Sequence, residues 1–453
     1  MNKLNSKIRS KTLVAPGKTQ GGAVLILVAV SLVVIAGFAA ISIDSGRAYG
    51  AKARLAAATD AAAIAGVRNL AEGATDAARI ANAQAGAAQF FNLNFPQNTV
   101  GATVTAPATN VVKQANGQWR VTVNAQANLP TTFARVLGFN DTPIATMSQA
   151  IRRDLDLMMV FDSSGSMIGS LDTLKVAAKN NFLDKFIPGP GGDRVGFVTY
   201  AYGSEINEPI NKTSVRGFTK SNVETAIDAM IASGRTATSE GLRKGFEELQ
   251  AIPPGSRSSL RVMLLFSDGA PNVFGAQALR GGVPVEANWV HSGAVRKRAG
   301  LPDFDRFVNP DRTAGGSVPG GSPDIPTTIP PLGLGGVPTG TPRDVSSGFS
   351  HCNLNKVSRN MMENAAERAR NAGIIVYSVG LGTNLLRVEK EDCPFSSDTA
   401  ETGENLLKRV ANTADVDTFN PNQPEGLYCW AADQTEIDNC FEQISRSIIR
   451  LTL

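Results

Sequence analysis

Residues 155–166 read LDLMMVFDSSGS, an apolar run that ends in one carboxylate and three hydroxyls. The run over 155–161 is apolar at nearly every position, which is expected of a strand that is covered on both faces of a sheet. Asp162, Ser164 and Ser166 follow at the carboxyl end of this predicted strand. In an open sheet of parallel strands, that end is where ligands bind. The stretch therefore predicts an α/β fold and places a candidate binding site within it.

Helix and strand patterns alternate along the chain beyond this stretch. Apolar periodicity predicts strands over 194–200, 260–266 and 374–379, and helices over 171–187, 221–232, 239–250, 353–372 and 435–451. Such alternation is typical of a doubly wound, mostly parallel sheet with helices on both faces. We therefore expect a single α/β domain over residues 153–453.

One segment inside this domain has a different composition. Residues 271–352 are dense in Gly and Pro, as in GGSVPGGSPDIPTTIPPLGLGGVPTGTPRD. We expect this insert to be mobile, with pieces of polyproline II and without a packed core. It leaves the domain just after Asp268, so it could form part of the surface around the candidate site. An indifferent loop excursion explains it equally well.

Two further oxygen-bearing side chains stand in loops that such a sheet could bring to the same edge. Thr236 lies in the sequence GRTAT, and Asp268 follows the strand predicted over 260–266. The full set then holds two carboxylates and three hydroxyls: Asp162, Ser164, Ser166, Thr236 and Asp268. These are hard oxygen ligands, which suit Mg²⁺, Mn²⁺ or Ca²⁺ rather than zinc.

This set resembles the metal-ion-dependent adhesion site of von Willebrand factor A domains, whose pattern is Asp-x-Ser-x-Ser with a distant Thr and a distant Asp. The likeness covers residues 153–453 apart from the insert. It implies that the three hydroxyls contact a divalent ion, that both aspartates bind it directly or through water, and that a protein partner supplies an acidic side chain to an open position. Arg235 stands where that family often has glycine. This side chain could repel the ion or help to hold the acidic ligand.

The amino-terminal part has the pattern of a membrane anchor. Residues 21–43 carry no charge, and at about 1.5 Å per residue a helix of this length crosses a bilayer core of about 30 Å. The stretch is longer than the apolar part of a cleaved signal peptide, about 7–15 residues. Residues 1–20 hold basic but no acidic side chains, which places them in the cytoplasm. We expect a single pass through the inner membrane, with the bulk of the chain periplasmic or at the cell surface.

Residues 44–152 change from a helical to a strand pattern. An alanine-rich helix is predicted over 45–91, with no proline before Pro96, and strands are predicted over 100–105, 119–123 and 144–150. We expect the alanine face to pack closely against another helix or a sheet, although a plain spacer remains an alternative. A long helix followed by a small antiparallel sheet is the layout of pilins, so a pilin-like α+β stalk region is expected here.

The start of this region holds Asp44 at the end of the apolar stretch, then Arg47 and Arg54, and a TDAAA run at 59–63. It resembles the amino-terminal segment of TadG-like proteins of the tight-adherence (Flp) pilus system. In that family a transmembrane helix ends in an aspartate and is followed by an arginine-bearing helix and an Ala-Asp-Ala-Ala-rich run. The resemblance covers roughly the first 150 residues and implies partners among pilus or secretion components.

Composition bears on several other function classes. The formal net charge is +4, with 44 basic and 40 acidic residues, so we expect no nucleic-acid partner. The two histidines, His291 and His351, both fall inside the insert, which argues against histidine-based catalysis and against an enzyme. Four cysteines lie in the last quarter of the chain. An external location favours disulfides, and of the three possible pairings we expect Cys352–Cys393 and Cys429–Cys440.

Three functions are consistent with these observations. The first is a membrane-anchored component of pilus assembly or surface adhesion that binds a divalent cation and, through it, a protein partner. The second is a structural minor pilin-like protein in which the metal site only stabilises the domain. The third is an accessory module of a metal-chelatase or AAA+ system, but such modules work in the cytoplasm and lack an external stalk.

Overall fold

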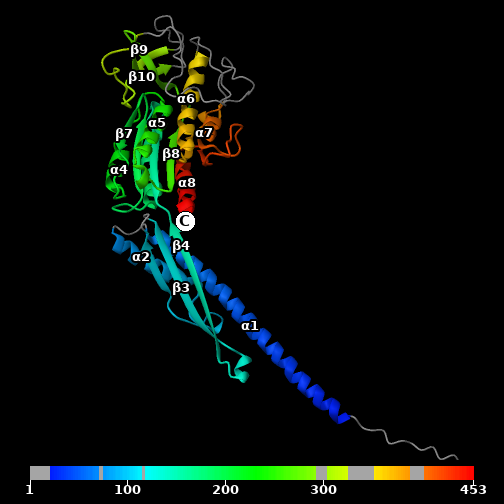
Figure 1. Ribbon diagram of the computed structural model, residues 1–453. Helices are drawn as coiled ribbons and strands as arrows, with labels where there is room; N and C mark the ends of the chain where they lie inside the picture. Colours follow the sequence, from blue (N-terminus) through cyan, green and yellow to red (C-terminus); the bar gives the residue numbers. More distant parts are fainter. Residues whose placement is uncertain are drawn as a thin grey trace, which may run out of the picture. The chain divides into compact units, whose positions relative to one another are not determined.

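The computed structural model describes residues 21–70, 75–114, 118–291, 304–324, 351–387 and 402–452 (Figure 1). They divide into two compact units. The first unit holds the described residues up to Ala61, together with Phe90–Ala108 and Asn124–Ser148. The second unit holds Ala62–Gln89, Thr109–Val123 and the described residues from Gln149 onward.

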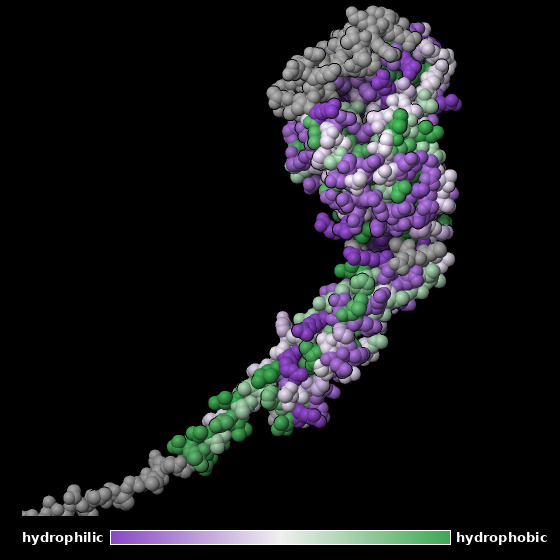
Figure 2. Space-filling model, turned by 180° about the vertical axis from the view of Figure 1, so that it is seen from behind, coloured by the Kyte–Doolittle hydropathy of each residue, from purple (hydrophilic) through white to green (hydrophobic). Residues whose placement is uncertain are grey.

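Helix α1 (Gly21–Asn69) begins with the apolar stretch that was predicted to cross a membrane. It is long and apolar enough to do so, and its apolar side chains from Val24 onward form an exposed hydrophobic surface (Figure 2). Further along, Leu55 and Ala58 are buried, as expected of an alanine-rich face that packs closely.

The helix predicted over 45–91 is interrupted. Helix α1 ends at Asn69, and a separate helix α2 (Asp76–Asn94) follows. The two helices approach closely, because a Cβ on Gly66 would lie 3.2 Å from the Ala83 carbonyl oxygen. Glycine at this position therefore permits a contact that a larger residue would prevent.

A small sheet follows the two helices. Strands β1 (Thr103–Val104), β2 (Ala108–Lys113) and β4 (Asp141–Arg152) all pair with β3 (Trp119–Pro130). Along β3 every second side chain is buried, which is the period expected of a sheet with one covered face. The sequence located β1, β3 and β4 approximately but did not predict β2.

The second unit contains a six-stranded sheet in the order β13-β12-β8-β5-β6-β7. Neighbouring strands are parallel except β6 and β7, which are antiparallel. The predicted doubly wound, mostly parallel sheet is therefore confirmed. The strands are β5 (Leu155–Asp162), β6 (Arg194–Tyr200), β7 (Ser204–Glu208), β8 (Leu260–Ser267), β12 (Ile375–Leu381) and β13 (Tyr428–Ala431).

Helices cover both faces of this sheet (Figure 1). Leu157, Met159 and Phe161 of β5 share one buried cluster with α3, α4 and α8. Met158 and Val160 share the opposite cluster with α5, α6 and α7. Since successive side chains point to opposite faces, a strand covered on both must be apolar throughout. The helices are α3 (Leu171–Ala177), α4 (Lys220–Asp228), α5 (Thr238–Gln250), α6 (His351–Asn371), α7 (Gly403–Ala411) and α8 (Ile437–Thr452).

One predicted helix is shorter than expected. The α-helical pattern over 171–187 continues only to Ala177, after which the chain forms a π-helical turn over Ala178–Phe182 and a 3₁₀ turn over Leu183–Lys185. Ala178, Phe182 and Leu183 are nevertheless buried in the same core cluster. The apolar spacing therefore identified the buried face correctly but not the hydrogen-bonding pattern.

The strand order reverses between β5 and β8. The chain leaves β5 towards β6 on one side of the sheet, whereas it leaves β8 towards β12 on the other side. Connections that depart in opposite directions open a crevice outside the carboxyl ends of the two strands, which is the usual ligand position in such sheets. Any site here is thus formed by the residues that follow β5 and β8.

Part of the Gly- and Pro-rich insert is folded, contrary to the expectation that it lacks a packed core. Strands β9 (Val273–Arg280), β10 (Val283–His291) and β11 (Phe304–Val308) form an antiparallel sheet. Buried aromatic rings pack on it, with Trp289 against Phe274 and Phe304. The prediction failed because the Gly and Pro content of the whole segment concealed a short aromatic core. Residues 292–303 and 325–350 lie outside the described residues.

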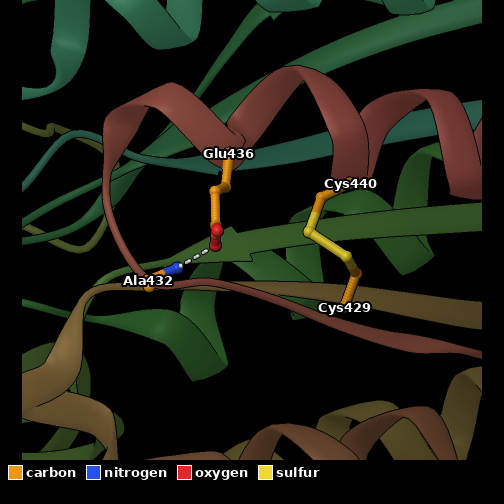
Figure 3. Close-up of a disulfide and its surroundings, with 4 residues drawn as sticks. All are labelled: Cys429, Ala432, Glu436 and Cys440. Carbon is orange, nitrogen blue, oxygen red and sulfur yellow. Dashed lines mark hydrogen bonds between the residues drawn. A yellow bond between two sulfur atoms is a disulfide. The ribbon is translucent and has the colours of Figure 1, made fainter.

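The last helix is tied to the edge of the six-stranded sheet. Cys429 of β13 and Cys440 of α8 form a disulfide (Figure 3), the pairing expected from the sequence. In the same connection, the Ala432 N–H donates a hydrogen bond to the Glu436 carboxylate at 2.9 Å (Figure 3). The other expected pair, Cys352–Cys393, falls on a side chain and a residue that lie outside the described part of the chain.

Candidate metal centre

Side chains from two loops meet outside the carboxyl ends of β5 and β8. Asp162 is the last residue of β5, Ser164 and Ser166 lie in the turn that follows, and Asp268 comes directly after β8. The Ser164 and Ser166 hydroxyl oxygens are 3.0 Å apart, and the Ser166 hydroxyl donates to Asp268 Oδ1 at 2.9 Å. Ser166 and Asp268, which are 102 positions apart in sequence, are thus in direct contact at the predicted edge of the sheet.

Asp162 is held in place by its own loop and by β8. Its side chain is fully buried, with 0% exposed. Oδ1 accepts a hydrogen bond from the Ser164 N–H at 2.8 Å, and Oδ2 accepts one from the Ser267 hydroxyl at 2.9 Å. The first bond is the local side-chain-to-backbone turn that aspartate favours at the end of a strand. Neither Asp162 nor Asp268 forms an ion pair with a basic side chain among the described residues.

The loop that carries Thr236 lies against the serine turn. The Ser233 N–H donates to the Ser163 carbonyl at 2.8 Å, and the Gly165 N–H faces the Gly234 carbonyl at 3.3 Å. The Thr236 side chain is buried, and its N–H donates to Asn272 Oδ1 at 2.8 Å. The structure therefore brings all three sequence clusters to one place, although the contact of the Thr236 loop is made through backbone groups.

Gly234 is required for this arrangement. Its φ is +86°, a left-handed conformation that costs little only for glycine. A Cβ here would also lie 2.7 Å from the ring of Tyr202. Arg235, the residue that departs from the family pattern, is half-buried next to Thr236. Its influence on a cation or on an acidic ligand stays a prediction.

The ionised forms of the two carboxyl groups are disfavoured in the folded protein. Burial and then the negative charge of Asp268 raise the pKa of Asp162 to about 7, although hydrogen bonds from Ser164 and Ser267 act in the opposite direction. Burial also raises the pKa of Asp268, against the hydrogen bond from Ser166. Two neighbouring carboxylates without a counter-charge cannot both ionise easily near neutral pH. A bound cation would supply that counter-charge.

The residues present fit a hard divalent cation. All the candidate donors are oxygens, and no group of three or more His, Cys, Asp or Glu gathers within the described ranges, so a cation here would depend on the hydroxyls. Asp162 and Ser164 are buried, whereas Asp268 is half-buried and Ser166 is exposed. The group is therefore closed on the protein side and open on the other, where a ligand from a partner could reach a bound ion.

Two residues that support the site were missed by the sequence analysis. Ser267 donates to Asp162, and its position directly before Asp268 at the end of a strand could have indicated it. Asn272 positions the Thr236 loop through its side chain, while its own N–H donates to the Thr236 carbonyl at 3.0 Å. No sequence signal links Asn272 to Thr236, because the contact depends on the fold of the loop after β8.

The folded part of the insert lies beside the Thr236 loop. The Tyr202 ring faces Gly234. The Arg306 guanidinium of β11 lies over the same ring, 5.0 Å from its centre, and donates a hydrogen bond to the Tyr202 hydroxyl at 2.8 Å. A cavity of about 540 Å³ is lined by Tyr202, by Phe304 and Phe307 of β11, and by the loop after β11. The insert thus contributes a hollow surface beside the Thr236 loop, together with an arginine, Arg306, that is also paired with Asp305.

Comparisons with known proteins agree with these features. The family described as "von Willebrand factor type A domain" matches residues 156–284, which contain the complete candidate site. The family described as "Putative Flp pilus-assembly TadE/G-like" matches residues 21–78. The chain thus carries a TadE/G-like amino-terminal region followed by a von Willebrand factor type A domain, and both resemblances inferred from the sequence are confirmed.

The solved structures that match this chain, with TM-scores below 0.5, include two pilus proteins. One is the PilB minor pilin from Streptococcus sanguinis, with a TM-score of 0.38 and 14% identity over 78% of this chain and 79% of the pilin. Another is the vWF domain of the type V pili tip protein Mfa5 from Porphyromonas gingivalis, with a TM-score of 0.39 and 14% identity over 67% of this chain and 98% of that domain. No curated protein matches the sequence.

Proposed function

We propose that the chain is a membrane-anchored component of pilus assembly or surface adhesion that binds a divalent cation and, through it, an acidic side chain of a protein partner. The observation that carries this proposal is the contact between the Ser164–Ser166 turn and Asp268, beside a buried Asp162 that forms no ion pair with any basic side chain in the described part of the chain. The ion would be Mg²⁺, Mn²⁺ or Ca²⁺, held by these four residues and Thr236.

The donor set favours binding of a partner rather than catalysis. Neutral hydroxyls leave a divalent ion more electrophilic than a shell of carboxylates does, so an anionic ligand remains attractive at an open position. The exposed side of the group, at Ser166 and Asp268, is where such a ligand could enter. Arg235 adds positive charge nearby, which would assist an acidic partner.

The amino-terminal region supports the cellular setting. The TadE/G-like match includes the apolar start of α1, and the basic residues of 1–20 favour a cytoplasmic position for that end by the positive-inside rule. The von Willebrand factor A domain would then lie in the periplasm or at the cell surface. Its partners would be other pilus or secretion components.

Calorimetric titration of Mg²⁺ and Mn²⁺ into the detergent-solubilised chain tests the cation site. We expect saturable binding that is lost in Asp162→Ala and Asp268→Ala and kept in Asp172→Ala, an exposed acidic control on α3. Loss of binding in the control as well would assign the signal to general surface charge. A folded wild-type chain that binds neither ion would refute the cation-dependent function.

A purely stabilising cation is the second candidate, because the raised pKa of Asp162 means that an ion would also favour the folded domain. Adhesion or pilus assembly in cells that express Asp162→Ala separates the two readings. We expect the variant to be folded and membrane-bound but unable to support adhesion or assembly. Full adhesion by that variant would favour the stabilising role instead.

A further inference from the structure

The connection between β3 and β4 is bonded to α1 at the point where its apolar stretch ends. The Asp44 carboxylate accepts hydrogen bonds from three consecutive backbone N–H groups of this connection, those of Thr132 at 2.9 Å, Phe133 at 2.9 Å and Ala134 at 2.7 Å. Asp44 is only 8% exposed. These backbone hydrogen bonds hold the pKa of its carboxyl below the usual range. The loop is therefore fixed to α1 by a charged side chain.

The loop itself, residues 131–140, is ordered. The Thr131 N–H donates to the Asn140 carbonyl at 3.1 Å and closes its base, and a short 3₁₀ turn over Ala134–Leu137 forms its tip. Arg47 on α1 donates to the Thr132 hydroxyl and adds a second tie to the helix. Figure 1 shows this end of the β3–β4 hairpin beside α1.

The ordered loop exposes apolar side chains. Val136 is 89% exposed, Phe139 66% and Phe133 44%, and the only charged residue among them, Arg135, is exposed as well. Several exposed apolar side chains on a surface that faces water mark a site of contact with another protein or with a membrane. Among the described residues, the hydrogen bonds of the loop are made by its backbone and its threonines, so they do not depend on these exposed apolar side chains.

The position of the loop identifies the membrane as the surface that it contacts. Residues 21–43 hold no charge and Asp44 is the first charged residue after them, so an α1 that spans a bilayer places Asp44 at the boundary between lipid and water. A loop bonded to Asp44 lies at the same level. Aromatic side chains are enriched at this depth, and an arginine can reach the lipid phosphates from it.

We propose that loop 131–140 is a second membrane contact, which inserts Phe133, Val136 and Phe139 into the boundary between head groups and acyl chains beside α1. Arg135 would face the lipid phosphates. The inference rests on the proposed membrane anchor and adds to it a fixed hairpin that dips about 5–10 Å into the leaflet, as amphipathic surface elements do. The occupant of this apolar surface is therefore lipid, and not another protein.

Tryptophan fluorescence of the full chain in phosphatidylcholine–phosphatidylglycerol nanodiscs tests the contact. The variant is Val136→Trp, and its signal is read as the difference from the unsubstituted chain, which already holds Trp119, Trp289 and Trp430. We expect emission at shorter wavelength and quenching by phospholipids that are brominated near the ester end of the acyl chain. Phe139→Trp, which replaces one exposed ring by another, must give the same result.

Two matched controls separate the possible failures. Met147→Trp is the exposed control on β4, since Met147 is 63% exposed and its neighbour Thr146 bonds to Thr59, roughly 22 Å beyond Asp44 along α1. We expect it to be quenched by aqueous iodide only. Val33→Trp reports on the anchor itself and is expected to be quenched by lipids brominated near the methyl end.

The outcomes distinguish the loop from the anchor. If Val33→Trp is not quenched by any brominated lipid, the chain does not span the bilayer and both proposals fail. If it is quenched while Val136→Trp and Phe139→Trp behave like Met147→Trp, the anchor stands and the loop proposal is overturned. Protection of the loop tryptophan only after another pilus protein is added would also overturn it, because the surface would then serve a protein partner.

Discussion

Replacing Asp162 by Asn is expected to stabilise the metal-free protein at pH 8 while it abolishes cation binding. The Asp162 side chain is fully buried, and burial with the nearby Asp268 charge raises its pKa to about 7. An unfolded aspartate ionises near pH 4. As the pH rises from about 4 to about 7, the unfolded chain releases this proton while the folded chain keeps it. Stability therefore falls through this window and the full cost is present above pH 7.

The size of the effect follows from the same shift. About three pKa units at about 1.4 kcal/mol each correspond to roughly 4 kcal/mol of lost stability in the metal-free protein at pH 8. Asn avoids this cost and can still accept the hydrogen bond from the Ser164 N–H. The Ser267 hydroxyl, which donates to Oδ2 of the aspartate, can turn to accept from the amide. For a domain of this size, the gain would raise the melting temperature by on the order of 10 °C.

Scanning calorimetry of the detergent-solubilised chain in EDTA, at pH 5 and at pH 8, measures this difference. We expect the melting temperature of Asp162→Asn to exceed that of the wild type at pH 8 by about three times as much as at pH 5, where only about one pKa unit of the cost has developed. Addition of Mg²⁺ should raise the wild-type value only. Equal destabilisation of the protein by the substitution at both pH values would refute the reasoning, since it would mean that ionisation of the buried Asp162 does not destabilise the folded state.

Three further substitutions have expected outcomes of different kinds. Asp156→Ala is expected to lower the free energy of urea unfolding by about 3–5 kcal/mol, because it leaves the buried Arg194 without the counter-charge of the equally buried Asp156. An unchanged urea midpoint would argue against that ion pair. Gly234→Ala should weaken Mg²⁺ binding in calorimetry, because φ of +86° and the adjacent ring oppose a Cβ; wild-type affinity would show that the threonine loop tolerates displacement. Cys429→Ser should lower stability by about 3 kcal/mol by opening the bond to Cys440 across 11 positions, and dithiothreitol should lower the stability of the wild type by at least as much.

The buried parts of the fold were the most predictable from sequence. Residues 155–161 alternate between two buried clusters, and a strand that must be apolar on both faces leaves a strong signal. The insert was predicted wrongly because Phe274, Trp289 and Phe304 are few and dispersed among many glycines and prolines. Their packing depends on pairing between β9, β10 and β11, which is a long-range property that no local pattern reports.

The candidate site could likewise be predicted in part. Asp162, Ser164 and Ser166 are close in sequence, so their spacing alone indicates a shared turn. That Asp268 reaches Ser166 follows from the position of β8 next to β5, which the predicted parallel sheet made plausible. The support from Asn272 could not be predicted, because a single amide side chain in a loop has no partner that can be named before the loop is folded.

The position of β5 has a mechanical consequence. The chain enters the domain at Leu155, the first residue of β5, and Asp162 is the last residue of the same strand. A partner that pulls on a cation at Asp162 while the anchor holds the chain before Leu155 would load this one strand along its length. Strand β5 is bonded to β6 on one side and to β8 on the other. Because both loaded residues belong to this one strand, the tension would pass along its covalent backbone while the two ladders keep the strand in place. A tether built in this way carries tension through the covalent backbone of one central strand.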